Sequence, residues 1–391
     1  MTSEGSALTR RVLATAMFIG TLDRVVIPPM LLTIAADLDL SFGRVTFVAS
    51  AYYLLYGVMQ LLWGVLADRF GRVAVLRFTL AVGAAGGMLS AASTGYWSLL
   101  AGRATAGAVL GAIAPTVIVY IGDSVPAAQR QHAMADLLAI VALGTAAGIT
   151  LGGISASYLS WRVAFALPAC AAAVAAILVG RLPEPARADR RPLARQLARV
   201  LTEPWVILVC AFALVEGAIV LGVVTYLVPA LEASGFSAAV AGLAVAIYGL
   251  SDFGWTRLAR RSLGRLGPQG MIAAGAALMA VGLVIGAISV SLVGVAILGA
   301  LLGGGFVFMH STFQAWAVDL IPDARGTVLA LFATSMFAGG SLATFVFGSL
   351  ASSSQFSAIF ASSAAVIVPL GVAAAVARRR YGLGRARAGI G

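Results

Sequence analysis

The segment GVLADRFGRVAVLR, residues 64–77, lies between two long apolar runs and differs from both of them. It gathers four charged residues and two glycines within fourteen positions. Charge is scarce elsewhere, because only 10% of the 391 residues are charged whereas 61% are hydrophobic. A soluble chain of this length exposes far more charge. The segment is therefore typical of a short connection between two membrane-embedded elements.

Apolar stretches recur along the whole chain, and its mean hydropathy is +0.99. Each stretch has about 20 residues, enough for a helix to cross a hydrocarbon core ~30 Å thick. The alternation of apolar and polar residues that marks a membrane β-barrel is absent from the sequence. We therefore expect an all-α membrane protein with twelve transmembrane helices. The expected spans are residues 12–36, 43–66, 74–94, 97–121, 132–157, 162–181, 205–231, 238–258, 269–289, 292–318, 326–351 and 355–377.

The basic residues are unevenly distributed, and all 26 are arginines. Every second connection is rich in arginine, whereas the alternate connections carry only Arg44 and Arg162. By the positive-inside rule the arginine-rich side is cytoplasmic, so both termini are cytoplasmic and the number of spans is even. The net charge of +11 thus reflects topology and not nucleic-acid binding. We expect a multi-pass protein of the cell (inner or plasma) membrane.

The longest charged connection lies near the middle of the chain and divides six expected spans from six. DSVPAAQR, residues 123–130, leaves the fourth span, and DLIPDAR, residues 319–325, leaves the tenth, with Asp and Pro offset by 196 positions. Two related halves with a site between them are a common plan among transporters. We expect a first bundle over residues 1–181, a cytoplasmic linker over 182–203, and a second bundle with a basic cytoplasmic tail over 204–391.

The opening segment carries a specific pattern, whose residues are Gly64, Leu66, Ala67, Asp68, Arg69, Gly71 and Arg72. This pattern resembles the loop signature between the second and third helices of the major facilitator superfamily. The resemblance implies two pseudo-symmetric six-helix bundles. It also implies a cytoplasmic latch that holds the halves together when the cavity opens outward. In that latch Asp68 would meet the start of the eleventh helix, and Arg72 could pair with Asp123.

The same residues also have a physical interpretation of their own. Gly64 lets a facing helix approach closely, and Asp68 can neutralise the positive N-terminus of a neighbouring helix. If the charges only fixed the topology, the arginines would be explained but not Asp68 or the glycines. The equivalent loop of the second half, TRLARRSLGRLG at residues 256–267, lacks the acid, so we expect an asymmetric latch.

Two glycine-rich spans indicate which group within the superfamily the chain resembles. The fourth span places Arg103, Gly107, Gly111 and Pro115 at four-residue intervals, and the fifth carries Gly144, Gly148, Gly152 and Gly153. With the segment WRVAF at residues 161–165, they are similar to the arginine and antiporter motifs of the twelve-helix drug:proton antiporters, although Ile149 stands where those exporters usually carry proline. The resemblance implies proton-coupled efflux of a small amphipathic or drug-like molecule by alternating access, performed by a monomer.

Ionisable residues within the spans are the candidates for proton coupling, because such residues are costly in a membrane and are usually functional. Glu216 lies near the centre of the seventh span with no other charge in its helix, so it is costly to ionise and is our first proton-carrier candidate. The alternative is a protonated side chain that only hydrogen-bonds between helices. Asp23 is the second candidate, and Arg103 could share its cavity.

Further polar residues are candidates for the coupling site or for the lining of a substrate cavity. Arg24 precedes Pro28 and Pro29, whose missing N–H groups leave backbone carbonyls free. Neighbours on a helix point about 100° apart, so Asp23 and Arg24 need not pair. Asp252 is either a cavity acid or part of the latch. The remaining cavity candidates are Tyr248, His310 and Gln314.

The sequence contains no phosphate loop, metal-ligand cluster or nucleophile–base arrangement. We therefore expect a protein that is not an enzyme and uses no cofactor, with protons, a small molecule and the lipid bilayer as its partners. The composition favours an amphipathic or cationic substrate. The alternatives are proton-coupled uptake, export of a sugar or nucleoside, and a transport-inactive sensor or scaffold of the same fold. The intramembrane acids argue against the last.

The predicted topology can be tested with reporter fusions at Ser353 and Gly391. One more span separates these positions, so the two reporters should lie on opposite sides of the membrane. Reporters on the same side would contradict the count of twelve.

Overall fold

The computed structural model describes residues 3–125, 127–185 and 193–387, and the regular elements in this part of the chain are all helices. The first group of helices is α1 (Ser3–Val25), η1 (Pro28–Met30), α2 (Leu31–Asp37), α3 (Phe42–Phe70), α4 (Arg72–Ala91), α5 (Tyr96–Leu110), α6 (Ile113–Ser124), α7 (Ala127–Tyr158) and α8 (Trp161–Val179). After α9 (Leu193–Thr202) come α10 (Pro204–Ala233), α11 (Ala238–Val245), α12 (Ile247–Ile288), α13 (Leu292–Leu320), η2 (Pro322–Ala324), α14 (Arg325–Ser352) and α15 (Phe356–Arg387). Residues 186–192 of the predicted linker and 388–391 of the predicted tail lie outside the described residues.

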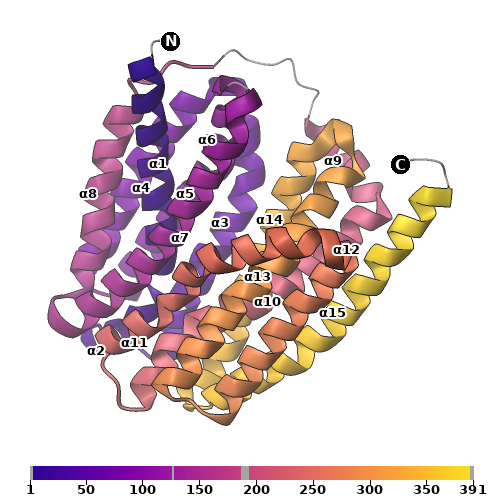
Figure 1. The fold of residues 1–391 in the computed structure, drawn as a ribbon. Coiled ribbons are helices and arrows are strands. Elements are labelled where there is room, and N and C mark those ends of the chain that lie inside the picture. The colour runs from indigo at the N-terminus through magenta and orange to yellow at the C-terminus, as the bar shows by residue number, and fades with distance from the viewer. Residues whose placement is uncertain (1–2, 126, 186–192, 388–391) are drawn as a thin grey trace.

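The two groups form two bundles that stand side by side (Figure 1). Both termini lie at the same end of the molecule. We call this end the terminal face and the opposite end the distal face. The ribbons of the two bundles diverge toward the terminal face and meet toward the distal face.

The described residues contain eleven helical stretches that are long and apolar enough to cross a membrane. Ten of them correspond to one expected span each. The stretch Ala238–Ile288 has 51 residues. As one straight helix it would be about 75 Å long, more than twice the thickness of a hydrocarbon core. Gly267 interrupts it with a positive φ of 63°, immediately before Pro268.

The chain reverses its direction at Gly267, because the two arms of α12 run in opposite senses along α13. Before the turn, later residues of α12 meet later residues of α13, and after the turn the order is inverted. The stretch therefore crosses the membrane twice, and the predicted total of twelve crossings is confirmed. The neighbouring pairs are Ile247–Gly299 and Trp255–Gly304 before the turn, and Gly275–Gly305 and Gly286–Leu298 after it.

Serine side chains cap four helices that begin at the distal face. Each hydroxyl accepts a hydrogen bond from a backbone N–H in the first turn, which satisfies a donor that the helix itself leaves unpaired. These short polar caps allow the connections at this face to be brief. The caps are Ser41 of α3, Ser160 of α8, Ser237 of α11 and Ser291 of α13.

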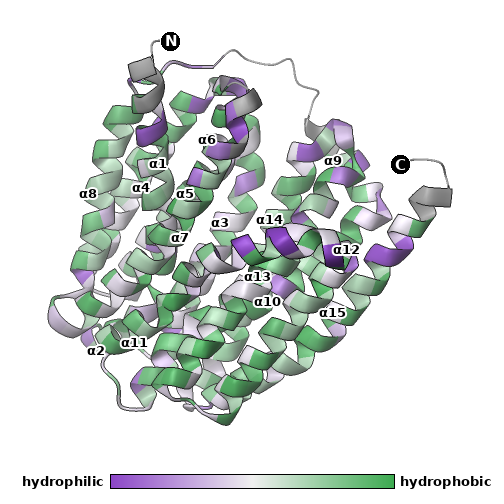
Figure 2. Ribbon diagram, in the orientation of Figure 1, coloured by the Kyte–Doolittle hydropathy of each residue, from purple (hydrophilic) through white to green (hydrophobic). Residues whose placement is uncertain are grey.

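Apolar residues cover both bundles along their length, whereas hydrophilic residues gather toward the terminal face (Figure 2). Large exposed apolar side chains occur on many helices. A surface of this kind is stable only against lipid or another apolar partner. Examples are Leu62, Phe78, Val174, Val284 and Val372.

The glycine stripe of α7 allows it to contact α1 at backbone distance. A Cβ atom added at Gly144 would lie 3.1 Å from the carbonyl oxygen of Phe18, and one at Gly148 would lie 2.6 Å from that of Leu22. Gly152 meets the carbonyl oxygen of Val26 even more closely. The four-residue spacing of the stripe is thus matched by the same spacing along α1, as close helix packing through small residues requires.

Two of the helix pairs that join the bundles make hydrogen bonds across the boundary. The α3–α14 pair carries hydrogen bonds from Ser50 to the Ser341 carbonyl at 2.9 Å and from Thr334 to the Gly57 carbonyl at 2.8 Å. Nearer the terminal face, a Cβ atom added at Gly64 of α3 would meet no atom within 4 Å. The other pair is α7 with α11, where Gly153 packs on the Ala238 carbonyl and the N–H of Ala239 donates to Ser157 at 2.8 Å. The bundles are therefore held together at mid-span and toward the distal face.

Replacing Gly148 with Leu tests the contact between α7 and α1. Even the Cβ atom would collide with the Leu22 backbone, which cannot move aside like a flexible side chain. We expect a lower thermal unfolding temperature for the purified protein in detergent. Ala147→Leu on the partly exposed neighbouring position is the matched control. An unchanged unfolding temperature in Gly148→Leu would contradict the importance of this contact.

Candidate functional site

The first cluster of buried charge lies between α1, α3 and α5. Arg103 donates to both carboxylate oxygens of Asp23, at 3.0 and 2.8 Å, and to the backbone carbonyl of Asp23 at 3.2 Å. The hydroxyl of Tyr52 donates to the same carboxylate at 2.9 Å. A bidentate pair of this kind is both strong and directional. The structure thus brings two of the candidate coupling residues into one buried unit.

Two aromatic rings enclose the guanidinium of Arg103. Its central carbon lies 4.4 Å from the ring centroid of Tyr52 and 4.8 Å from that of Phe165, which are favourable cation–π distances. The Asp23 carbonyl is free to accept because α1 ends at Val25. In a continuous helix the N–H four residues further on would occupy it. The break in the first span is therefore part of the site.

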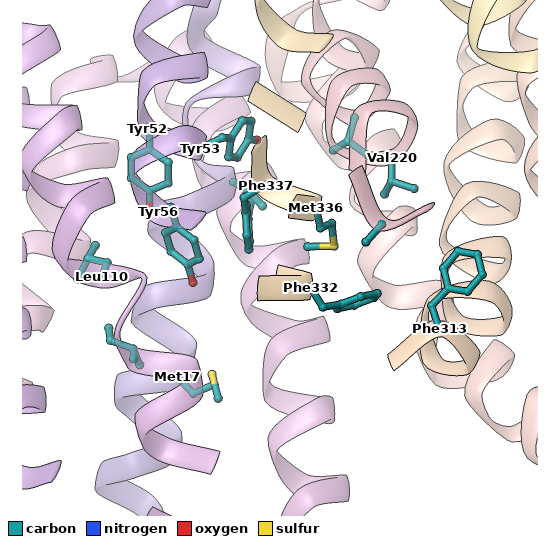
Figure 3. Close-up of a cluster of buried hydrophobic side chains, with 14 of the residues drawn as sticks. Met17, Tyr52, Tyr53, Tyr56, Leu110, Val220, Phe313, Phe332, Met336 and Phe337 are labelled. Carbon is teal, nitrogen blue, oxygen red and sulfur yellow. The ribbon is translucent and has the colours of Figure 1, made fainter. Parts of the chain in front are cut away.

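Arg24 does not join this unit and lies beside the second bundle. Its guanidinium carbon is 5.8 Å from the ring centroid of Phe337 in α14. Tyr53 and Tyr56 of α3 face the same ring, with centroid distances of 6.5 and 4.7 Å (Figure 3). The sequence predicted that Asp23 and Arg24 need not pair, and the structure shows that they extend to different partners.

The second cluster lies in the other bundle, between α10 and α13. Nδ1 of His310 is 2.8 Å from the carboxylate of Glu216, whose side chain is fully buried. The His310 ring stacks on Phe306, at a centroid distance of 4.3 Å, and contacts Phe332. The other carboxylate oxygen of Glu216 is buried without a hydrogen-bond partner among the described residues. Glu216 and His310 were separate candidates in the sequence, and the structure joins them.

The structure places the three other candidates of the second half on α12 and α13. Tyr248 lies within electrostatic range of Arg24, Asp252 and Glu216. One carboxylate oxygen of Asp252 is buried and has no hydrogen-bond partner in the described part of the chain. Gln314 is exposed, one turn beyond His310 on α13. Asp252 thus lies among the polar residues near mid-span, close to the boundary between the bundles.

The loop between α3 and α4 is organised around Arg72, whose side chain is only 2% exposed. Its guanidinium lies 2.6 Å from the carboxylate of Asp123 in α6 and 4.0 Å from that of Asp68. Gly71 has a positive φ of 104°, a conformation that favours glycine and that lets α3 end and α4 begin within one residue. Arg69 stacks on Phe70 instead of joining the pair.

Glu184 is a residue of this loop region that the sequence did not single out. Its carboxylate accepts the backbone N–H of Arg72 at 2.5 Å and that of Val73 at 2.9 Å, so it caps α4. An acid at the positive N-terminus of a helix is stabilising. The sequence assigned this type of role to Asp68. The sequence does show an acid in the segment that follows α8. The residues around this acid do not indicate which helix it caps.

Two bundles of membrane-spanning helices, with charged residues buried in pairs at mid-span, are an arrangement typical of membrane transporters. A family model described as Major Facilitator Superfamily matches residues 13–344. The chain therefore belongs to the major facilitator superfamily.

Curated relatives include both exporters and importers. The cephamycin export protein CmcT of Amycolatopsis lactamdurans is 33% identical over 159 residues, which are 40% of this chain and 33% of that protein. The efflux pump dotC of Dothistroma septosporum is 31% identical over 41% of this chain and 27% of that pump. The vacuolar membrane amino acid uptake transporter fnx2 of Schizosaccharomyces pombe is 29% identical over 41% of this chain. The match covers 28% of the length of fnx2. The chain therefore spans a third or less of the length of each of these three relatives.

Solved structures show the same fold. A mutant of the nucleoside transporter NupG has a TM-score of 0.77 at 14% identity, covering 93% of this chain and 98% of that one. A D-xylose-proton symporter has a TM-score of 0.75 at 20% identity, covering 94% of this chain and 96% of that one. These identities support the fold alone.

The role of Asp68 can be tested without a substrate. If Asp68 stabilises the form that is closed at the terminal face, Asp68→Asn should shift the protein toward the open form. The distance between spin labels at Gly122 of α6 and Gly382 of α15, where an added Cβ meets no atom within 4 Å, reports the opening. Cys170 and Cys210 are first replaced by Ala.

The Asp68→Asn variant should show a larger fraction of long distances, whereas Arg130→Gln, an exposed arginine near the same face, should not. Identical distance distributions in Asp68→Asn and the parent protein would contradict a latch at this position.

Proposed function

We propose that this chain is a proton-driven antiporter that exports a small amphipathic molecule by alternating access. The observation that carries the proposal is that each bundle buries a carboxylate beside a basic partner near mid-span. These pairs are Asp23 with Arg103 and Glu216 with His310. A carboxylate in such a place is costly when it is alone, so its presence indicates a function.

The chemistry of coupling follows from what each pair does when it gains a proton. A protonated carboxylate no longer attracts its basic partner electrostatically, so that partner is released to other contacts. Asp23 is held by two bonds from Arg103 and one from Tyr52. Glu216 is held by His310 alone and keeps one oxygen without a partner among the described residues. Glu216 is therefore the first proton carrier in our proposal, and Asp23 the second.

The outward direction is supported by the contacts of α7. Its glycine stripe, which resembles the antiporter motif, packs on α1 through Gly148. On its other side it packs on α11 of the second bundle through Gly153. The helix thus connects the first bundle, beside the break in α1, to the bundle that must move against it. The similarity to CmcT and dotC, an export protein and an efflux pump by name, agrees with this direction.

Proton-coupled uptake is the second candidate. It is favoured by the relative fnx2, an uptake transporter by name, and by the structural likeness to a proton symporter. The same buried pairs serve either direction, because alternating access is reversible. A sensor or scaffold without transport has no need of these pairs. We further propose that the chain works as a monomer in the cell membrane, with the terminal face in the cytoplasm, as the arginine distribution indicates.

Proteoliposomes that enclose the pH-sensitive dye pyranine can test the proposal. A panel of amphipathic compounds is added from outside, and a compound that moves protons through the protein is taken as the transported probe. Opposite movement of probe and protons indicates antiport, whereas movement in the same direction indicates uptake by symport.

The proton carrier is identified with Glu216→Gln, which keeps the shape of the side chain but cannot ionise. We expect probe exchange to continue while accumulation driven by a pH gradient is lost. Glu232→Gln, which changes another glutamate of α10, is the matched control and should accumulate the probe normally. Full accumulation by Glu216→Gln together with its loss in Asp23→Asn would assign the proton to Asp23. Normal accumulation in both variants would contradict proton coupling at these pairs.

A further inference from the structure

Arg24 is partly exposed and lacks the ion pairs that the two arginines buried in the described part of the chain, Arg72 and Arg103, have. Arg103 is paired with Asp23, and Arg72 is paired with Asp123. No carboxylate of the described residues lies within ion-pair distance of Arg24. Its Nε is buried without a hydrogen-bond acceptor among the described residues, as are the Nε atoms of Arg72 and Arg103, so the missing ion pair is what distinguishes Arg24. An arginine within a span normally faces a counter-charge or water, and Arg24 has no counter-charge among the described residues but is partly exposed.

The surroundings of Arg24 form a boundary of aromatic rings between the bundles. Its guanidinium lies over Phe337, and Tyr56 is close enough for a polar contact with it. Tyr53, Tyr56 and Phe337 are each at most 4% exposed, whereas Arg24 itself is partly exposed. The rings hold a cation that a molecule between the bundles can still reach.

We propose that Arg24 binds the carboxylate of the transported molecule. A guanidinium offers a planar pair of N–H donors that fits a carboxylate, which makes arginine well suited to this class of ligand. A bound anion would also compensate the charge that the protein leaves unpaired. The substrate is thus an anionic amphiphile, whereas the composition favoured an amphipathic or cationic compound. This inference rests on the proposed function only in placing the substrate between the bundles.

The acids of the second bundle do not remove the need for this anion. Glu216 is already bonded to His310. Asp252 and Arg24 both lie within electrostatic range of Tyr248, but they form no ion pair in this conformation. If Asp252 were the partner of Arg24 after a conformational change, Arg24 would stabilise that state without selecting any substrate. A binding experiment that varies only the ligand's charge separates these two roles.

The probes are three sets of compounds, each with one apolar scaffold and three head groups. The first set is indole-3-acetate, indole-3-acetamide and tryptamine, and equivalent sets are built on naphthalene and on phenylpropane. Dissociation constants are obtained from the rise in thermal unfolding temperature of the full-length protein in a neutral detergent. On at least one scaffold the carboxylate should bind at least tenfold more tightly than the amide and the amine.

Arg24→Gln should weaken carboxylate binding at least tenfold and leave amide binding unchanged, while Arg24→Lys should retain part of the preference. The unfolding temperature of each variant without ligand shows whether it is folded. Arg44→Gln, which changes an arginine stacked on Tyr96 in the first turn of α3, is the control and should bind all compounds normally.

The proposal is overturned if no carboxylate binds more tightly than its amide, or if the preference survives in Arg24→Gln. The measurement is made at equilibrium without a gradient, so a failure of proton coupling does not affect it. Gradient-driven transport of a neutral or cationic compound, with no preference for carboxylates, would leave the proposed function standing and remove this inference.

Discussion

The ion pair between Asp23 and Arg103 is the interaction on which the assembly of the first bundle depends. An ionised side chain in a hydrocarbon core is stable only with a partner, and here the partner comes from a helix 80 residues away. The pair joins α1 to α5, and the Tyr52 hydroxyl adds α3. The break of α1 after Val25 contributes a backbone carbonyl to the same guanidinium. Charge pairing and helix geometry are thus satisfied by one arrangement.

Close packing through glycine provides the second constraint. Without side chains at Gly144, Gly148 and Gly152, α7 contacts the backbone of α1 directly, and on its other side Gly153 brings it against α11. In such contacts the two helix backbones pack directly on each other, and no long side chains have to be ordered between them. The bundles are joined along α3–α14 and α7–α11, and they diverge at the terminal face (Figure 1). This is the geometry that a rocking motion of one bundle against the other requires.

The charges at mid-span divide into those that are paired within a bundle and one that is not. In the pairs Asp23–Arg103 and Glu216–His310, a carboxylate that gains a proton loses its attraction to the basic partner. This response makes the pairs suitable for coupling transport to protons. Arg24 has no such partner among the described residues and lies at the aromatic boundary between the bundles. The division suggests separate places for proton binding and for the recognition of a substrate anion.

The sequence by itself determined the class of fold, the spans and the connections. Hydropathy and arginine distribution act locally, since each span must be apolar over its own length and each loop lies on one side of the membrane. Even the break at Gly267 and Pro268 within α12 was predicted, from the charged connection at residues 256–267. The signature at residues 64–72 likewise indicated the family.

Only the tertiary structure decided which charges meet. Glu216 and His310 are 94 residues apart, and Glu184 and Arg72 are 112 apart. Asp23 has a basic neighbour in sequence but pairs with a distant arginine. Hydropathy gives the depth of a residue in the membrane but not its direction around the helix axis or the helix that it faces. Those depend on how twelve spans pack, and the pairing of the candidate site therefore had to come from the assembled bundles.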